Sequence, residues 1–154
     1  MIPLSPLQLK RHAFAAISLR AVHKGTSHAE ATLEPTAQCV ADPKTPNCWH
    51  LALTLKIGSG NPEKPFLYEG EIQIVGEVEV HDSFPAENRE QIARVNGTGL
   101  LYSAAREMVL NLSARSMHGP LSLPVLNFVE FFANGGKALK KAGQEKSEPS
   151  RPPG

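Results

Sequence analysis

The chain has 154 residues and a mass of 16.6 kDa, which is the size of one globular domain. Apolar residues make up 41% and charged residues 20%, and the formal net charge is +1, so no strong field draws nucleic acid or anionic lipid. No apolar run is long enough to span a membrane, and the first residues lack the basic start of a secretory signal. Because Cys39 and Cys48 make no disulfide framework, we expect a reducing cytoplasm, with a single disulfide left open as an alternative.

Alternating apolar and polar residues in the first half of the chain predict four strands. The strands cover residues 14–22, 29–40, 51–57 and 66–80. In the last strand, apolar residues share one face, and the opposite face carries an acidic row that Val75 interrupts. The acidic row consists of Glu69, Glu71, Glu77 and Glu79. One polar face is typical of an antiparallel sheet covered on a single side, and a bend is expected at Gly70 or Gly76.

The second half of the chain changes to a helical period. One long helix is predicted from Glu87 onwards, and Gly97 and Gly99 should kink or break it. An extended link over residues 121–124 follows, since residues before proline avoid the α region. A second helix is predicted over about residues 125–134, with the next two glycines as its cap.

This order of elements predicts an α+β fold, a four-stranded antiparallel sheet with two helices packed on one face, in a single domain over residues 1–136. Residues 137–154 hold five basic and two acidic residues and are rich in Pro, Gly and Ser. No apolar period there could offset the entropy of ordering, so the sequence predicts a basic, disordered tail.

Residues that could carry chemistry are scattered along the chain. None of the six histidines lies at a metal-ligand spacing, and Gly97-Thr98-Gly99 lacks the Gly-Lys-Ser/Thr ending of a phosphate loop. His81 with Glu77 or Glu79 could serve a small hydrolase, and the acidic row could be a solvated face or dock a basic partner. We expect a protein that is not an enzyme and uses no metal or cofactor.

The long helix is apolar or small around most of its circumference between residues 100 and 114. A helix of this kind is buried on several sides, whereas one sheet covers only one of them. Two interpretations stay open: burial by self-association, and an exposed apolar groove that captures extended peptide.

The segment between residues 100 and 128 resembles the SecB family of protein-export chaperones. The shared pattern is an aliphatic pair with an aromatic residue, then Ala-Arg-Glu, a further Arg, a Leu/Pro-rich link and a final Asn-Phe. The matching residues are Leu100, Leu101, Tyr102, Ala105, Arg106, Glu107, Arg115, Leu123, Asn127 and Phe128. Phe66-Leu67-Tyr68-Glu69 also looks like the Phe-Leu-x-Glu strand of the family, and Ala16-Ile17-Ser18-Leu19 resembles its first strand.

The resemblance implies a homotetramer, a dimer of dimers, that acts as an ATP-independent holdase for unfolded or precursor polypeptides. Clients would lie in apolar grooves. The expected partners include no nucleic acid, and the protein is not expected to insert into a membrane. By position, the groove residues would be Phe66, Tyr68, Ile72, Tyr102, Leu121, Leu123, Val125 and Phe128. The resemblance further implies that Leu67 and Glu69 contact the SecA translocase ATPase during protein export.

The chain also departs from the family pattern. Ser103 and Ala104 stand where the family has proline and an aromatic residue, and Arg20 replaces an acid of the first strand. The alternative is therefore a SecB-like interaction module, or a dedicated chaperone for one cognate partner such as a toxin–antitoxin component, without delivery to a translocase.

Overall fold

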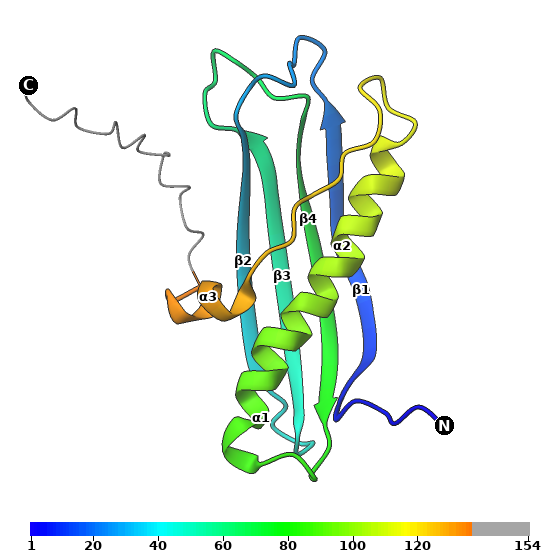
Figure 1. The fold of residues 1–154 in the computed structure, drawn as a ribbon, viewed down its shortest axis with the longest axis vertical. Helices are drawn as coiled ribbons and strands as arrows, with labels where there is room; N and C mark the ends of the chain where they lie inside the picture. Colours follow the sequence, from blue (N-terminus) through cyan, green and yellow to red (C-terminus); the bar gives the residue numbers. More distant parts are fainter. Residues whose placement is uncertain (137–154) are drawn as a thin grey trace, which may run out of the picture.

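A computed structural model describes residues 1–136, and the predicted tail at residues 137–154 lies outside the described residues. One sheet forms a layer, and the helices lie together on one of its faces (Figure 1). The elements are β1 (Leu7–Ala21), β2 (Ala31–Ala41), β3 (Cys48–Ser59), β4 (Tyr68–Val80), α1 (Ala86–Ile92), η1 (Ala93–Gly97), α2 (Thr98–Ser113) and α3 (Phe128–Ala133). The strand order is β1-β4-β3-β2 with every pair antiparallel, so the predicted α+β fold is confirmed.

The core lies between the helices and the two central strands, β3 and β4. Alternate residues of these strands point to the helices and are buried, as strand periodicity requires. They are Leu51, Leu53, Leu55 and Ile57 of β3, and Tyr68, Ile72, Ile74, Val78 and Val80 of β4. From the other side α2 contributes Leu101, Tyr102, Ala105 and Val109. Their spacing of three or four residues places them on one helix face.

Strand β1 begins at residue 7, although the sequence predicts a strand only from residue 14. Two register shifts, between Leu9 and Arg11 and between Phe14 and Ala16, each insert one residue against β4. A one-residue insertion moves the following side chains to the other face. Leu9, Phe14 and Ile17 therefore stay on the helix side although their spacing is not even, and the alternation on which the prediction rests is lost.

No register shift accompanies Gly70 or Gly76, because the pairing of β4 with β3 runs unbroken from Gly70 to Glu79. The irregularity lies in β1 instead. The glycines serve close approach: a Cβ on Gly76 would lie 2.7 Å from Cδ2 of Leu101, and one on Gly70 would overlap the backbone of Ser18.

The glycine-containing stretch of the long helix does not break it. Residues 93–97 form a π-helical segment, η1, which joins α1 to α2 in one continuous course. Gly97 is buried there, and a Cβ on it would overlap Cδ1 of Leu51. The glycine thus lets the helix lie close to β3. Where the sequence predicts a kink or break, the helix continues through a π-helical turn.

The second helix begins at residue 128 and not at residue 125. Asn127 caps it, because its side chain accepts a hydrogen bond from the Glu130 N–H at 3.2 Å. The predicted glycine cap is confirmed: Gly135 and Gly136 have φ values of 74° and 73° and donate to the carbonyls of Phe132 and Phe131.

Candidate peptide-binding surface

Residues 119–127 form an extended segment, called the strap here, between α2 and α3. The strap crosses the helix side of the sheet diagonally and reaches α3 beside β2 (Figure 1). It covers the part of the apolar sheet face that α2 leaves open. An extended segment without a strand neighbour must find other partners for its backbone polar groups.

Side chains of α2 and β4 supply those partners. Tyr102 donates its hydroxyl to the Pro124 carbonyl at 2.5 Å, and Arg106 donates its Nε to the Leu123 carbonyl at 2.9 Å. The Leu121 N–H donates to Ser113 Oγ at 2.7 Å, and the Tyr68 hydroxyl donates to the Gly119 carbonyl. Burial raises the pKa of Tyr102 to about 12, so its hydroxyl remains a donor at neutral pH. The strap is thereby fixed along most of its length.

The eight groove residues predicted from the sequence differ in their accessibility. Five are buried in the protomer: Tyr68, Ile72, Tyr102, Leu123 and Phe128, with exposed fractions of 1%, 0%, 3%, 5% and 5%. Phe66 and Leu121 are half-buried, and Val125 is 81% exposed. The buried residues support the wall of any groove, whereas the other three can meet a ligand directly.

The structure brings only part of the predicted set together. The rings of Tyr102 and Phe128 pack edge to face with centroids 5.5 Å apart, directly beside the pinned end of the strap. Tyr68 lies at the other end of the strap, where its ring meets His118, and Phe66 lies in the segment that precedes β4. The predicted residues are therefore spread along the strap, with Leu121 and Leu123 between its two ends.

Two hollows flank the α3 end of the strap. The first, of about 490 Å³, lies beside the long helix and is lined by Val95, Asn96, Gly99, Val125, Leu126, Asn127, Phe128 and Val129. The second, of about 140 Å³, lies beside β2 and is lined by Leu33, Pro35, Leu126, Asn127, Phe128, Glu130 and Phe131. Val129 is 60% exposed at the rim of the first hollow. Both hollows are mostly apolar and can accept aliphatic or aromatic side chains.

The sequence did not single out the β2 wall of the second hollow. Pro35 is buried within a strand, a position that proline takes on an edge strand because it has no N–H to donate. The proline in an alternating strand was the available signal for an edge. β2 is indeed the last strand of the sheet, so its outer edge faces the groove side without a strand neighbour among residues 1–136.

A second apolar surface runs along α2 on the flank away from the strap. It consists of Leu100, Ala104, Met108 and Leu112, each four residues from the next. Leu100 and Leu112 are both 42% exposed. Residues two apart on a helix lie about 200° from each other, so Ala104 and Met108 point away from the strap ligands Tyr102 and Arg106.

The acidic row lies on the sheet face opposite the helices, called the outer face here. Three of its four members pair with bases of β1: Lys10 lies 3.0 Å from Glu79, Arg11 lies 2.9 Å from Glu77, and Arg20 pairs with Glu69. The fourth, Glu71, accepts a hydrogen bond from Gln73. The row is therefore a ladder of ion pairs and not a purely acidic patch. Leu67, predicted with Glu69 as a translocase contact, is half-buried at the same end of the face.

The residues proposed for hydrolysis do not form a relay. His81 Nδ1 lies 2.8 Å from Ser83 Oγ and 3.3 Å from Asp82 Oδ1, so both neighbours compete for one ring nitrogen. A catalytic relay uses both nitrogens of the imidazole. Within the described part of the chain, no hydrogen bond or ion pair joins His81 to Glu77 or Glu79.

Both cysteines are free, so the disulfide alternative is wrong for this structure. Burial raises the pKa of the Cys39 thiol to about 11, which keeps it protonated and unreactive. Among residues 1–136, no three His, Cys, Asp or Glu side chains come together as metal ligands. No helix in the same range has the length and apolarity needed to cross a membrane.

Comparison with known proteins places the chain in a structural class. No family model and no curated protein matches the sequence. The fold, however, is that of SecB-like chaperones, so the resemblance seen in the sequence is confirmed at the level of the fold.

The SecB-like chaperone Rv1957 of Mycobacterium tuberculosis is similar with a TM-score of 0.57 and 18% identity, over 78% of this chain and 87% of that one. It was solved in complex with a ChAD peptide from the Rv1956 HigA1 antitoxin. A protein of unknown function from Streptococcus agalactiae gives a TM-score of 0.42 and 12% identity, over 77% of this chain and 96% of that one.

Proposed function

We propose that this protein is an ATP-independent chaperone, a holdase, that binds unfolded or precursor polypeptides along the strap side of the sheet. One observation carries the proposal: a SecB-like fold exposes Val125 at 81% and Val129 at 60% beside apolar hollows. Exposed apolar groups beside concave surfaces are typical of sites that bind other polypeptides. In this proposal the protein is a binding protein and not an enzyme.

Two features would hold a client without nucleotide. The hollows beside Phe128 would take apolar side chains of the client, and the outer edge of β2 would pair with its main chain. Non-native chains expose both kinds of group, and neither kind depends on a particular client sequence. The buried pair Tyr102 and Phe128 would support the wall from below.

We also propose that residues 1–136 form one SecB-like domain that assembles into a homotetramer, a dimer of dimers, in the cytoplasm. The apolar strip of α2, with Leu100 and Leu112 each 42% exposed, supports self-association. Ile17 of edge strand β1 is 45% exposed and also faces the helix side. Leu100→Arg with Leu112→Arg should convert the assembly to smaller species by light scattering, whereas Ser103→Arg on the exposed side of the same helix should not.

For partners, the proposal has two forms. In the export form, Leu67 and Glu69 would contact the SecA translocase, and the partner would have to compete with Arg20 for the Glu69 carboxylate. In the alternative form, the protein serves one cognate client, such as a toxin–antitoxin component. The antitoxin peptide bound by the similar Rv1957 chaperone favours the alternative.

The test of the holdase proposal is suppression of aggregation. A reduced, unfolded client such as carboxymethylated α-lactalbumin is mixed with the full chain without nucleotide, and turbidity is followed with time. The proposal predicts suppression at stoichiometric amounts that ATP does not change. Absence of suppression, together with co-purification of a single partner, would leave only the dedicated-chaperone form.

A further inference from the structure

The outer face of the sheet carries an apolar hollow of about 550 Å³ that the proposed client site does not use. Its floor is a row across three strands, because Val75 pairs with Ala13 of β1 and with Ala52 of β3. The two alanines leave space on either side of the valine. Val75 is 42% exposed and Val40, at the β2 side of the hollow, is 61% exposed.

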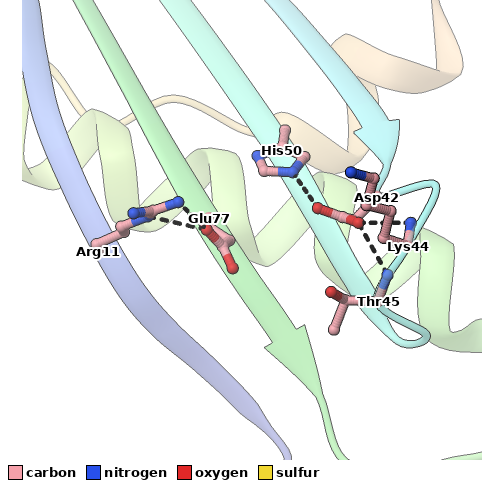
Figure 2. A network of polar contacts seen from close by, with 6 residues as sticks. All are labelled: Arg11, Asp42, Lys44, Thr45, His50 and Glu77. Atoms are coloured by element: carbon pink, nitrogen blue, oxygen red, sulfur yellow. Dashed lines mark hydrogen bonds and ion pairs between the residues drawn. The ribbon is translucent and has the colours of Figure 1, made fainter.

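One wall of the hollow is an ion pair whose basic member points outward. The β1 register shift between Leu9 and Arg11 places Lys10 and Arg11 both on the outer face. Arg11 donates its Nε–H to Glu77 Oε2 at 2.9 Å, and its Nη2 forms an ion pair with the same oxygen, also at 2.9 Å (Figure 2). The side chain of Arg11 is 79% exposed and that of Glu77 only 21%. The Nη1 end of the guanidinium has no hydrogen-bond partner among residues 1–136.

His50 of the neighbouring strand β3 continues the row of Arg11 and Glu77, because it is the register partner of Glu77. His50 Nε2 lies 2.6 Å from Asp42 Oδ2, and Asp42 Oδ1 accepts the backbone N–H groups of Lys44 and Thr45 at 2.8 and 2.9 Å (Figure 2). The side chain of His50 is 47% exposed and that of Asp42 is 19%. Glu77, the carboxylate that lines the hollow, is therefore mostly covered and already accepts a hydrogen bond, whereas Arg11 is exposed. Asp42 contacts His50 but does not line the hollow.

We propose that this hollow is a second docking site, for a polypeptide segment in which an apolar side chain is flanked by carboxylates. The apolar side chain would cover Val75 and Val40, and a carboxylate would take the free guanidinium edge of Arg11. Lys10 and Glu79, the next pair along β1 and β4, neutralise each other at 3.0 Å. The hollow is thus expected to prefer acidic segments, whereas an acidic sheet face would prefer basic ones. The proposal for this site does not depend on the holdase proposal.

The test uses the full chain and two fluorescein-labelled octapeptide probes. Both have a central Leu-Phe pair, flanked by glutamates in one probe and by lysines in the other. Fluorescence anisotropy should show tighter binding of the glutamate probe. Val75→Asp should weaken that binding by about tenfold, since it removes the burial of a valine. Arg11→Gln, at an exposed position that leaves folding intact, should weaken it by about threefold.

Met117→Asp, at a position that is 61% exposed and lines neither the outer-face hollow nor the hollows beside Phe128, is the matched control and should leave the affinity for the glutamate probe unchanged. Three results would overturn the proposal: tighter binding of the lysine probe, no binding of either probe at millimolar concentration, or equal affinity in wild type and in both outer-face variants. Loss of the preference for the glutamate probe in Val129→Asp would place that preference at the client site and would also overturn the proposal.

Discussion

Two exposed valines on the strap side offer the sharpest mutational test of client binding. Val125 and Val129 are 81% and 60% exposed, and both line the hollow beside Phe128. Replacing both by aspartate puts carboxylates where apolar client groups would bind. Because the side chains are exposed and Val129 lies in the first turn of α3, where an acid is favourable, the free energy of unfolding should change by less than about 0.5 kcal/mol per site.

The expected loss of affinity follows from the exposed area. Complete burial of a valine is worth about 1.5 kcal/mol. Since these valines are already partly covered in the free protein, burial by a client gains about 1 kcal/mol at each. Together they account for about 2 kcal/mol, which corresponds to about a thirtyfold change in the dissociation constant. Desolvation of the new carboxylates adds to the loss.

The assay is fluorescence anisotropy with a labelled, permanently unfolded client, alongside urea denaturation of each variant. Lys56→Asp is the matched control, because Lys56 is exposed on the outer face, lines none of the hollows described above, and its replacement changes the charge by the same two units. The double variant should lose affinity while Lys56→Asp keeps it. If the double variant retains its unfolding midpoint and binds within twofold of wild type, clients do not use the strap side.

Three further predictions concern stability, each measured by urea denaturation. Gly97→Ala should destabilise by about 1–3 kcal/mol because its Cβ overlaps buried Leu51, whereas Gly99→Ala, with open space around it, should stabilise by about 0.5–1 kcal/mol; equal effects would contradict the π-turn packing. Because the pKa of Tyr102 is raised from 10 to about 12, the free energy of unfolding of the protein should decrease as the pH rises from 10 to 12, and the Tyr102→Phe variant should lack that part of the pH dependence. Asp42, whose pKa is lowered to about 2, stabilises the fold above pH 4. The difference in free energy of unfolding between wild type and Asp42→Asn should therefore decrease as the pH falls from 4 to 2, and a difference that does not change with pH would argue against the His50 contact.

The sequence predicted the layers of the fold because its central strands alternate without interruption. β3 and β4 pair in one register over their length, so each apolar residue keeps its side. β1 escaped prediction before residue 14 because the bulge between Leu9 and Arg11 changes the side of the following residues, and a bulge depends on the neighbouring strand. The π-helical turn likewise depends on contact of Gly97 with Leu51, which is distant in the chain.

Prediction of the candidate site was partial for a related reason. Tyr102 and Phe128 could be named from the chain, and they do pack together. Which apolar residues remain exposed depends on where the strap lies, and the strap is placed by hydrogen bonds from side chains such as Arg106. No periodicity encodes these bonds. The pairing of the acidic row with bases of β1 was also hidden, because it follows from the bulged register.

Site-specific photo-crosslinking tests the central claim most directly. A photoreactive phenylalanine analogue is placed singly at positions 125, 129 and 56 of the full chain, and each protein is irradiated with the same unfolded client. Position 56 is exposed on the outer face and lines none of the hollows. Client binding along the strap side predicts crosslinks from positions 125 and 129 and only background from position 56. Crosslinks of equal yield from all three positions, or from position 56 alone, would contradict it.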